Sequence, residues 1–282
     1  MKTNRDRLVH RIVALVPALA VACLVAPLSA QTNAVATMTA EQEAELAKQT
    51  LNPVAALISV PLQNNWDFGI GPNDAMKYTL NIQPVVPLSI SDDWNLIVRT
   101  IVPVAELSPV YNGDKRHSGS GDITQSLFFS PKEPWHDWIV GAGPVGLYPS
   151  ATDPVFGNQQ WGAGPTFVVL QQQHGFTYGL LANHIWGFAG WGDQPTVNAS
   201  FVQPFFSYST KSYTSFGANT ESTYNWQAHE WTVPLNFTVT QLLKIGKLPI
   251  SLQFGYRYYA QRPAGGPDWG LRASITFLFP KK

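Results

Sequence analysis

The sequence has almost no cysteine and few charged residues, and each shortage excludes a class of protein. Cys23 is the single cysteine among 282 residues. It lies in an N-terminal segment that we expect to be cleaved, so the mature chain should have neither disulfides nor thiol chemistry. Charged residues make up 13% of the chain, whereas roughly 25% is typical of soluble domains. This composition disfavours an ordinary soluble enzyme.

The charges that are present balance, and the basic residues do not cluster. The chain has 18 Lys and Arg against 18 Asp and Glu, which gives a net charge of zero. Binding of nucleic acid requires a basic patch, so we expect no nucleic-acid partner. His117, His136, His174 and His229 fall in expected loops or turns without the spacing of metal ligands, and we expect no metal and no cofactor.

Residues 1–30 have the pattern of a secretory signal peptide. Basic residues up to Arg11 precede an apolar stretch over 12–27, and small residues at Ser29 and Ala30 mark a cleavage point. Two alternatives are an inner-membrane helix and a lipoprotein anchored through Cys23. No apolar run of about 18 residues follows the signal, which excludes a helical membrane protein.

The C-terminal stretch from Leu248 to Phe279 separates its side chains by parity into an apolar and a polar face. Successive residues of a strand point to opposite faces, and the turn at 262–268 makes the stretch an antiparallel hairpin. The apolar face is long enough to cross a bilayer. Its members are Leu248, Ile250, Leu252, Phe254, Tyr256, Tyr258, Ala260, Trp269, Leu271, Ala273, Ile275, Phe277 and Phe279.

About twelve such strands follow one another from Val54, and in lipid such strands are viable only as a closed barrel. We therefore predict an all-β fold, an antiparallel transmembrane β-barrel of about 12 strands over 54–282. The main alternative is a soluble periplasmic β-sandwich that binds a ligand. Connections alternate between tight turns and longer loops, and short turns are typical of the periplasmic side. Prolines interrupt several strands, where we expect bulges or kinks.

The tryptophans are expected at strand ends, as in the two aromatic girdles of membrane barrels. Those of the long-loop side are Trp66, Trp161, Trp186, Trp191, Trp226, Trp231 and Trp269, and those of the short-turn side are Trp94, Trp135 and Trp138.

Residues 31–53 contain the one helical stretch, Ala40 to Leu51, which ends at Asn52-Pro53. Two interpretations fit it, a periplasmic tail and a plug that enters the lumen. We favour the tail.

Four segments resemble a group of bacterial outer-membrane proteins labelled "transporter" or "meta-pathway of phenol degradation". They are 52–61 (NPVAALISVP), 201–208 (FVQPFFSY), 219–224 (NTESTY) and 270–280 (GLRASITFLFP). The resemblance covers nearly the whole mature chain and implies passage of small solutes, aromatic ones among them. It also implies insertion by the outer-membrane assembly machinery, although Pro280 and two lysines follow Phe279, where many such barrels end on an aromatic residue.

Polar side chains on the inward face are the candidate solute-facing residues. Hairpin geometry places Arg257 nearly opposite Arg272 and brings Glu221 to a similar level. Two cations with one carboxylate predict a net positive wall that favours anionic or phenolate-like solutes. An alternative is an ionic network that closes a narrow lumen. The complete set is Arg99, Asp122, Asn219, Glu221, Asn236, Gln253, Arg257, Tyr259 and Arg272.

A catalytic site is not expected. His184 is predicted to face lipid, and its cross-strand neighbour Ser200 is predicted to face inward, so the two should not form a nucleophile and base. We therefore predict a non-enzymatic outer-membrane barrel for passive uptake or binding of small solutes, with membrane lipid and solute as partners. The alternative is a structural surface barrel without transport. The oligomeric state is left open.

Overall fold

The structure is a computed structural model that describes residues 39–190, 196–246 and 248–280. Residues 40–282 form one compact unit. The predicted signal peptide and Trp191 lie outside the described residues, so both stay predictions. No helix in the described part of the chain is long and apolar enough to cross a membrane.

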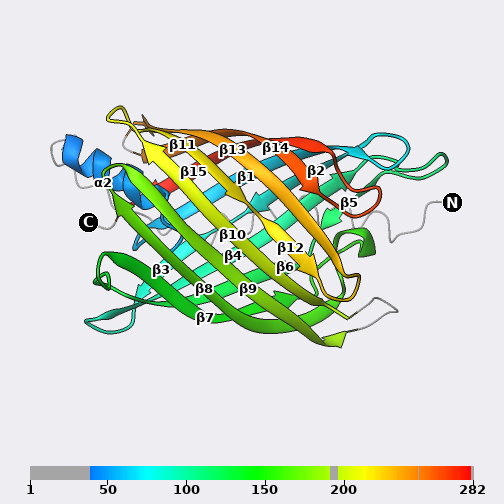
Figure 1. Cartoon of the computed structure of the whole chain (residues 1–282), viewed down its shortest axis with the longest axis horizontal. Coiled ribbons are helices and arrows are strands. Elements are labelled where there is room, and N and C mark those ends of the chain that lie inside the picture. Colours follow the sequence, from blue (N-terminus) through cyan, green and yellow to red (C-terminus); the bar gives the residue numbers. More distant parts are fainter. Residues whose placement is uncertain (1–38, 191–195, 247, 281–282) are drawn as a thin grey trace. The chain divides into compact units, whose positions relative to one another are not determined.

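The described chain consists mainly of antiparallel strands, with helix α2 (Ala40–Thr50) before them and a short 3-10 turn, η1 (Pro154–Phe156), in one loop (Figure 1). The strands are β1 (Ile58–Ile70), β2 (Ala75–Ile82), β3 (Val85–Ser89), β4 (Trp94–Leu107), β5 (His117–Ser120), β6 (Ile123–Pro131), β7 (Trp138–Tyr148), β8 (Gln160–Gln173), β9 (Phe176–Gly190), β10 (Asn198–Ser209), β11 (Thr214–Thr220), β12 (Ser222–Asn225), β13 (Glu230–Ile245), β14 (Leu248–Gln261) and β15 (Trp269–Phe279).

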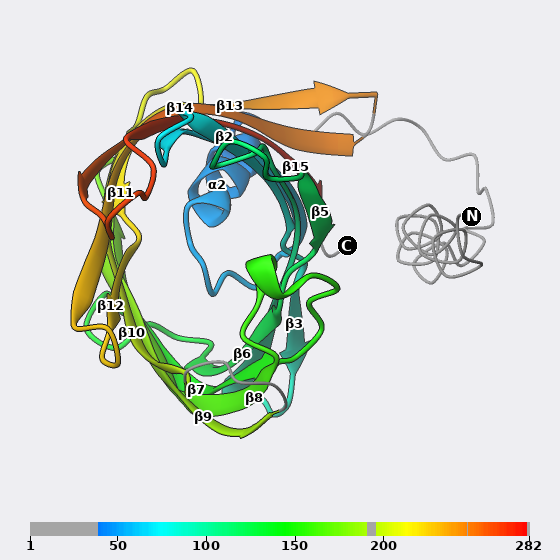
Figure 2. The ribbon, with the colours of Figure 1, turned by 90° about the vertical axis from the view of Figure 1, so that its right-hand side faces the viewer.

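The sheet closes on itself, because pairing runs from strand to strand along the chain and the first strand, β1, also pairs with the last, β15. Three of its strands are interrupted. β2 and β3 both pair with β1 and β4, β5 and β6 both pair with β4, and β11 and β12 both pair with β10 and β13. With each interrupted strand counted once, the fold is a closed barrel of 12 strands (Figure 2). The predicted fold is confirmed, and the β-sandwich is not what forms.

Prolines explain the three interruptions, since proline has no N–H to donate to the sheet. Pro84 lies between β2 and β3. Pro103 lies opposite the break between β5 and β6, where its carbonyl accepts from Gly121 N at 2.9 Å. Pro234 lies opposite the break between β11 and β12, next to a register shift at Val233. At other positions, such as Pro144 opposite Pro165, the ladder runs on without a register shift.

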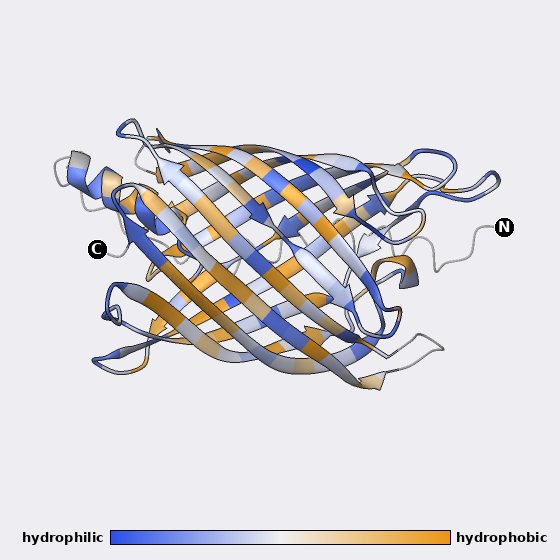
Figure 3. Ribbon diagram, viewed as in Figure 1, coloured by the Kyte–Doolittle hydropathy of each residue, from blue (hydrophilic) through white to orange (hydrophobic). Residues whose placement is uncertain are grey.

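Apolar and polar residues alternate along many of the strands, as predicted (Figure 3). On β14, Phe254 lies on the outer face and is 67% exposed. Arg257, three residues further along, points to the inner face and is 8% exposed. An outer face of this kind is stable in lipid, because apolar side chains have no hydrogen bonds to water that they would lose there. Exposed tryptophans such as Trp94 and Trp269 lie at the two ends of the strands.

The inner face is not uniformly polar. A buried apolar cluster lies on the inner side of β4, β6, β8 and β9, and Val54, which precedes β1, is part of it. The N-terminal segment therefore packs on this wall. Its members are Val54, Ile97, Phe128, Val168, Leu170 and Leu181, with Val85, Ile139, Phe201 and Phe205 packed against them.

Candidate functional site: the barrel lumen

A cavity of about 630 Å³ lies inside the barrel and has two chemically different walls. Ser, Thr and Gln side chains of β1, β13, β14 and β15 line one wall. Leu181 and Ile185 of β9, with Phe201 and Phe205 of β10, line the other. The charged residues of the lining are Arg99, Glu221 and Arg272. A cavity with an apolar side and a few polar groups is a typical small-molecule site.

The N-terminal segment contributes to this cavity. Residues 49–53, Ala55 and Leu57 are part of the lining. Helix α2 is held at the end of the barrel that carries the tight turns, where Glu43 forms an ion pair with Lys244 and the carbonyl of Lys48 accepts from Gln172 Nε2 at 2.9 Å. We favoured a tail from the sequence, and this placement supports the plug instead.

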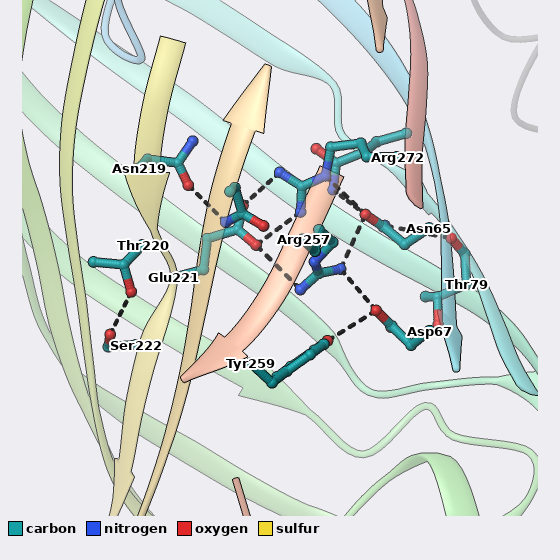
Figure 4. A network of polar contacts seen from close by, with 12 residues as sticks. Asn65, Asp67, Thr79, Asn219, Thr220, Glu221, Ser222, Arg257, Tyr259 and Arg272 are labelled. Carbon is teal, nitrogen blue, oxygen red and sulfur yellow. Dashed lines mark hydrogen bonds and ion pairs between the residues drawn. The ribbon is translucent and has the colours of Figure 1, made fainter. Parts of the chain in front are cut away.

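A pair of residues from distant strands forms the centre of the polar wall (Figure 4). Arg272 of β15 donates from Nη1 and Nη2 to the two carboxylate oxygens of Glu221, at 2.9 and 2.8 Å. Its Nε donates to Oδ1 of Asn65 at 2.8 Å. A guanidinium that binds a carboxylate at two points is among the stronger and more directional pairs in proteins. Arg272 is 4% exposed, so it is fixed in this position.

A second arginine and a second carboxylate extend the same network. Arg257 of β14 donates to Asn65 Oδ1 at 3.1 Å and lies 3.5 Å from Oδ1 of Asp67 and 3.6 Å from Oε2 of Glu221. The hydroxyl of Tyr259 donates to Asp67 at 2.9 Å. Gly270 of β15 lies between Arg257 and Asp67 in register. A Cβ at Gly270 would come within 2.6 Å of Asp67 Oδ1, so glycine leaves the space for this contact.

The network contains a carboxylate that was not among the predicted site residues. Two arginines were expected against Glu221 alone, but Asp67 is a second carboxylate in contact with Arg257. These four groups balance, and Lys77 of β2, the cross-strand partner of Asp67, adds a further cation beside them. Arg257 and Arg272 are therefore paired cations within an ionic network of the wall.

The other predicted site residues lie in three separate places. Asn236 donates to Asn219 at 2.8 Å beside the network. Gln253 of β14 donates to Thr240 of β13 at 3.1 Å on the same wall. Arg99 lines the cavity from β4. Asp122 is apart from all of them. Its carboxylate accepts from the N–H groups of Ala151 and Asn158, at 3.1 and 2.6 Å, and so holds the loop between β7 and β8.

No protein-family model and no curated protein sequence matches the chain. Among solved structures it is similar to an outer membrane channel from Pseudomonas putida F1, with a TM-score of 0.62 and 15% identity over 79% of this chain and 94% of that one. It also matches the NanC porin, with a TM-score of 0.48 and 11% identity over 79% and 100% of the two chains. Outer membrane phospholipase A from Escherichia coli follows, with a TM-score of 0.44 and 10% identity over 87% and 99%.

The chain folds as an outer-membrane β-barrel. At 15% identity the likeness to the channel concerns the fold alone. The outer membrane is the location that this fold and its apolar outer face indicate.

Two residues of the barrel's network, Asn65 and Asp67, were not among the predicted site residues. Asn65 is an uncharged amide, which gave no reason to single it out from the sequence. Asp67 was missed because it follows Trp66, one of the tryptophans expected at strand ends, whereas β1 continues to Ile70. The signal was present, since Asp67 has the same parity as Asn65.

The prediction that His184 and Ser200 lie on opposite faces is wrong. They are direct cross-strand partners of β9 and β10, and His184 Nδ1 lies 2.7 Å from Ser200 Oγ. Their odd-numbered neighbours, such as Asn183 and Ala199, line the cavity, which puts both partners on the outer face. The indole N–H of Trp226 also donates to Ser200 Oγ, at 2.9 Å. His184 Nε2 has no hydrogen-bond partner among the described residues, so the orienting third group of a catalytic triad is missing there.

Proposed function

We propose that this outer-membrane barrel is a passive channel for small solutes. The observation that carries the proposal is the cavity within a closed barrel, which combines a hydrogen-bonding wall with an apolar wall. Such a lining can replace part of the hydration shell of a small solute during passage. The N-terminal segment narrows the path, which suits small solutes more than large ones.

A preference for anionic solutes, and for aromatic ones as the phenol-degradation label implies, is a finer part of the same proposal. Among the charged side chains of the cavity lining, two are arginines and one is a glutamate. Arg257 is already paired with Asp67 and Glu221, so the support for anion preference comes from Arg99 rather than from Arg257. Phe201 and Phe205 offer aromatic surface to the same cavity.

Liposome swelling tests the channel function directly. Purified protein reconstituted into liposomes should admit small sugars, amino acids and simple aromatic acids at rates that fall steeply with solute size. Heat-denatured protein added in the same amount is the control. A structural surface barrel, the alternative, predicts no swelling with any solute, and that result would overturn the proposal.

A further inference from the structure

We infer that Arg99 is the anion-binding residue of a solute site in the lumen, and that this site takes a small monoanion with an apolar body. The inference rests on the proposed function in that the solute must enter the lumen. It assigns to the cavity a binding residue and a chemical class of ligand.

The first observation is that Arg99 is the cation of the lining that the protein leaves without a carboxylate partner. Its Nη2 donates to the neutral side chain of Gln83 at 3.0 Å. Within the described residues no carboxylate forms an ion pair with it, whereas Arg272 and Arg257 share Glu221. Glu221 affects Arg99 only over a longer distance.

A guanidinium in this position requires an anion or water. Arg99 is half-buried on the inner face of β4 and always charged. Arg99 is part of the cavity lining, so its remaining N–H groups are available to a solute in the cavity. A planar guanidinium matches the two oxygens of a carboxylate. The geometry therefore leaves a place for an anion in the lumen rather than in the wall.

The second observation is that the apolar wall begins directly beside Arg99. Val85 is its cross-strand partner on β3, and Ile97 is two residues away on the same face of β4. Both belong to the apolar cluster or pack against it, as do Phe201 and Phe205, which line the same cavity. A solute whose charge is held at Arg99 would therefore rest its body against apolar side chains.

These two features select among solutes by simple physical chemistry. A carboxylate such as benzoate gains both the charged hydrogen bonds and the burial of its ring. Acetate gains the hydrogen bonds alone, and benzyl alcohol gains the burial alone. Benzylammonium brings a second cation beside Arg99 and is repelled. A dianion would place its second charge near the apolar wall without a partner, which is unfavourable.

Equilibrium dialysis of radiolabelled benzoate against the folded protein in detergent tests the site without relying on transport. We expect saturable binding to the full mature chain, weakened about tenfold or more by Arg99→Gln, because a hydrogen bond to a charged group is lost. Unlabelled cyclohexanecarboxylate should compete, and acetate and benzyl alcohol should compete at least tenfold less well. Arg116→Gln, which removes an exposed loop arginine paired with Glu106, is the matched control and should bind as the unchanged protein does.

A second variant keeps the test independent of effects on folding. Phe201→Ala leaves Arg99 in place and should weaken benzoate binding while leaving the weak binding of acetate unchanged. Retention of heat-modifiable gel migration shows that each variant is folded. Benzoate binding that is absent, or equal in Arg99→Gln and the unchanged protein, would overturn the inference even if liposomes swell. Arg99-dependent binding without swelling would uphold the site and overturn the channel function.

Discussion

Arg272 and Glu221 are joined by two parallel hydrogen bonds of 2.9 and 2.8 Å although β13 and β14 lie between their strands. The pair lies on the lumen side of the wall, and Glu221 stands at the break between β11 and β12, opposite Pro234. This contact ties four neighbouring strands together.

Removal of Arg272 should destabilise the barrel more than removal of the whole pair. Arg272→Met leaves Glu221 with the longer contact to Arg257, and a buried ion that loses its partner costs roughly 3 to 5 kcal/mol. The double variant Arg272→Met with Glu221→Gln should recover a large part of that loss. Urea unfolding in lipid vesicles, followed by gel migration, measures the free energies. A double variant whose loss equals the sum of the single losses would show that the two residues do not interact.

A charge on the outer face of β14 should be costly, whereas the same charge one residue away should be tolerated. Phe254 lies at the centre of β14 and is exposed to lipid, and Gln253 lines the cavity. Arg at the midplane of a barrel's lipid face costs roughly 2 to 4 kcal/mol. Phe254→Arg should lower the free energy of unfolding in vesicles by about that amount, and Gln253→Arg by much less. Equal losses would mean that the assigned faces are incorrect.

Loss of helix α2 should widen the path. A chain without residues 40–50 keeps Val54 in its apolar cluster but lacks the helix and its ion pair with Lys244. We expect a higher single-channel conductance than that of the unshortened chain. Lys244→Gln, which removes the ion pair but keeps the helix, should raise the conductance less. If the shortened chain conducts as the unshortened one does, the helix does not restrict the lumen.

Ser200 should not behave as an activated nucleophile. His184 is within hydrogen-bond distance of it, but Ser200 Oγ is also bound by Trp226, and nothing among the described residues orients His184 Nε2. We expect no labelling by a fluorophosphonate probe in detergent or in vesicles. Labelling that disappears in Ser200→Ala and in His184→Ala would contradict the non-enzymatic account and indicate hydrolysis of acyl esters at the membrane surface.

Alternation together with the turns between strands was enough to predict the barrel and its strand number, because a period of two follows directly from strand geometry. Contacts between side chains of distant strands could not be predicted from this pattern. The register that brings Asp67 to Arg257 through the space at Gly270 depends on how β1 closes against β15, and no local pattern encodes that closure.

The misassigned face of Ser200 has a similar origin. Parity can be counted only along an uninterrupted strand, and the loop before β10 left its first residue uncertain in the sequence. The placement of the N-terminal segment was also hidden, because a short helix of Ala, Glu and Lys has the composition of a solvated tail. Leu46 and Ala47 of this helix are buried in the folded chain, which its composition did not indicate.

If solutes cross through the lumen, a charge attached to a residue that lines the cavity should obstruct the current, and cysteine modification during bilayer recordings measures this. Ser274 lines the cavity on β15, and its neighbour Ala273 has the opposite parity. In protein produced without residues 1–30, which include Cys23, each introduced cysteine is the single thiol. A charged thiol reagent should reduce the current through Ser274→Cys and leave that through Ala273→Cys unchanged. A current that is unaffected in Ser274→Cys although its thiol is fully modified would contradict passage through the lumen.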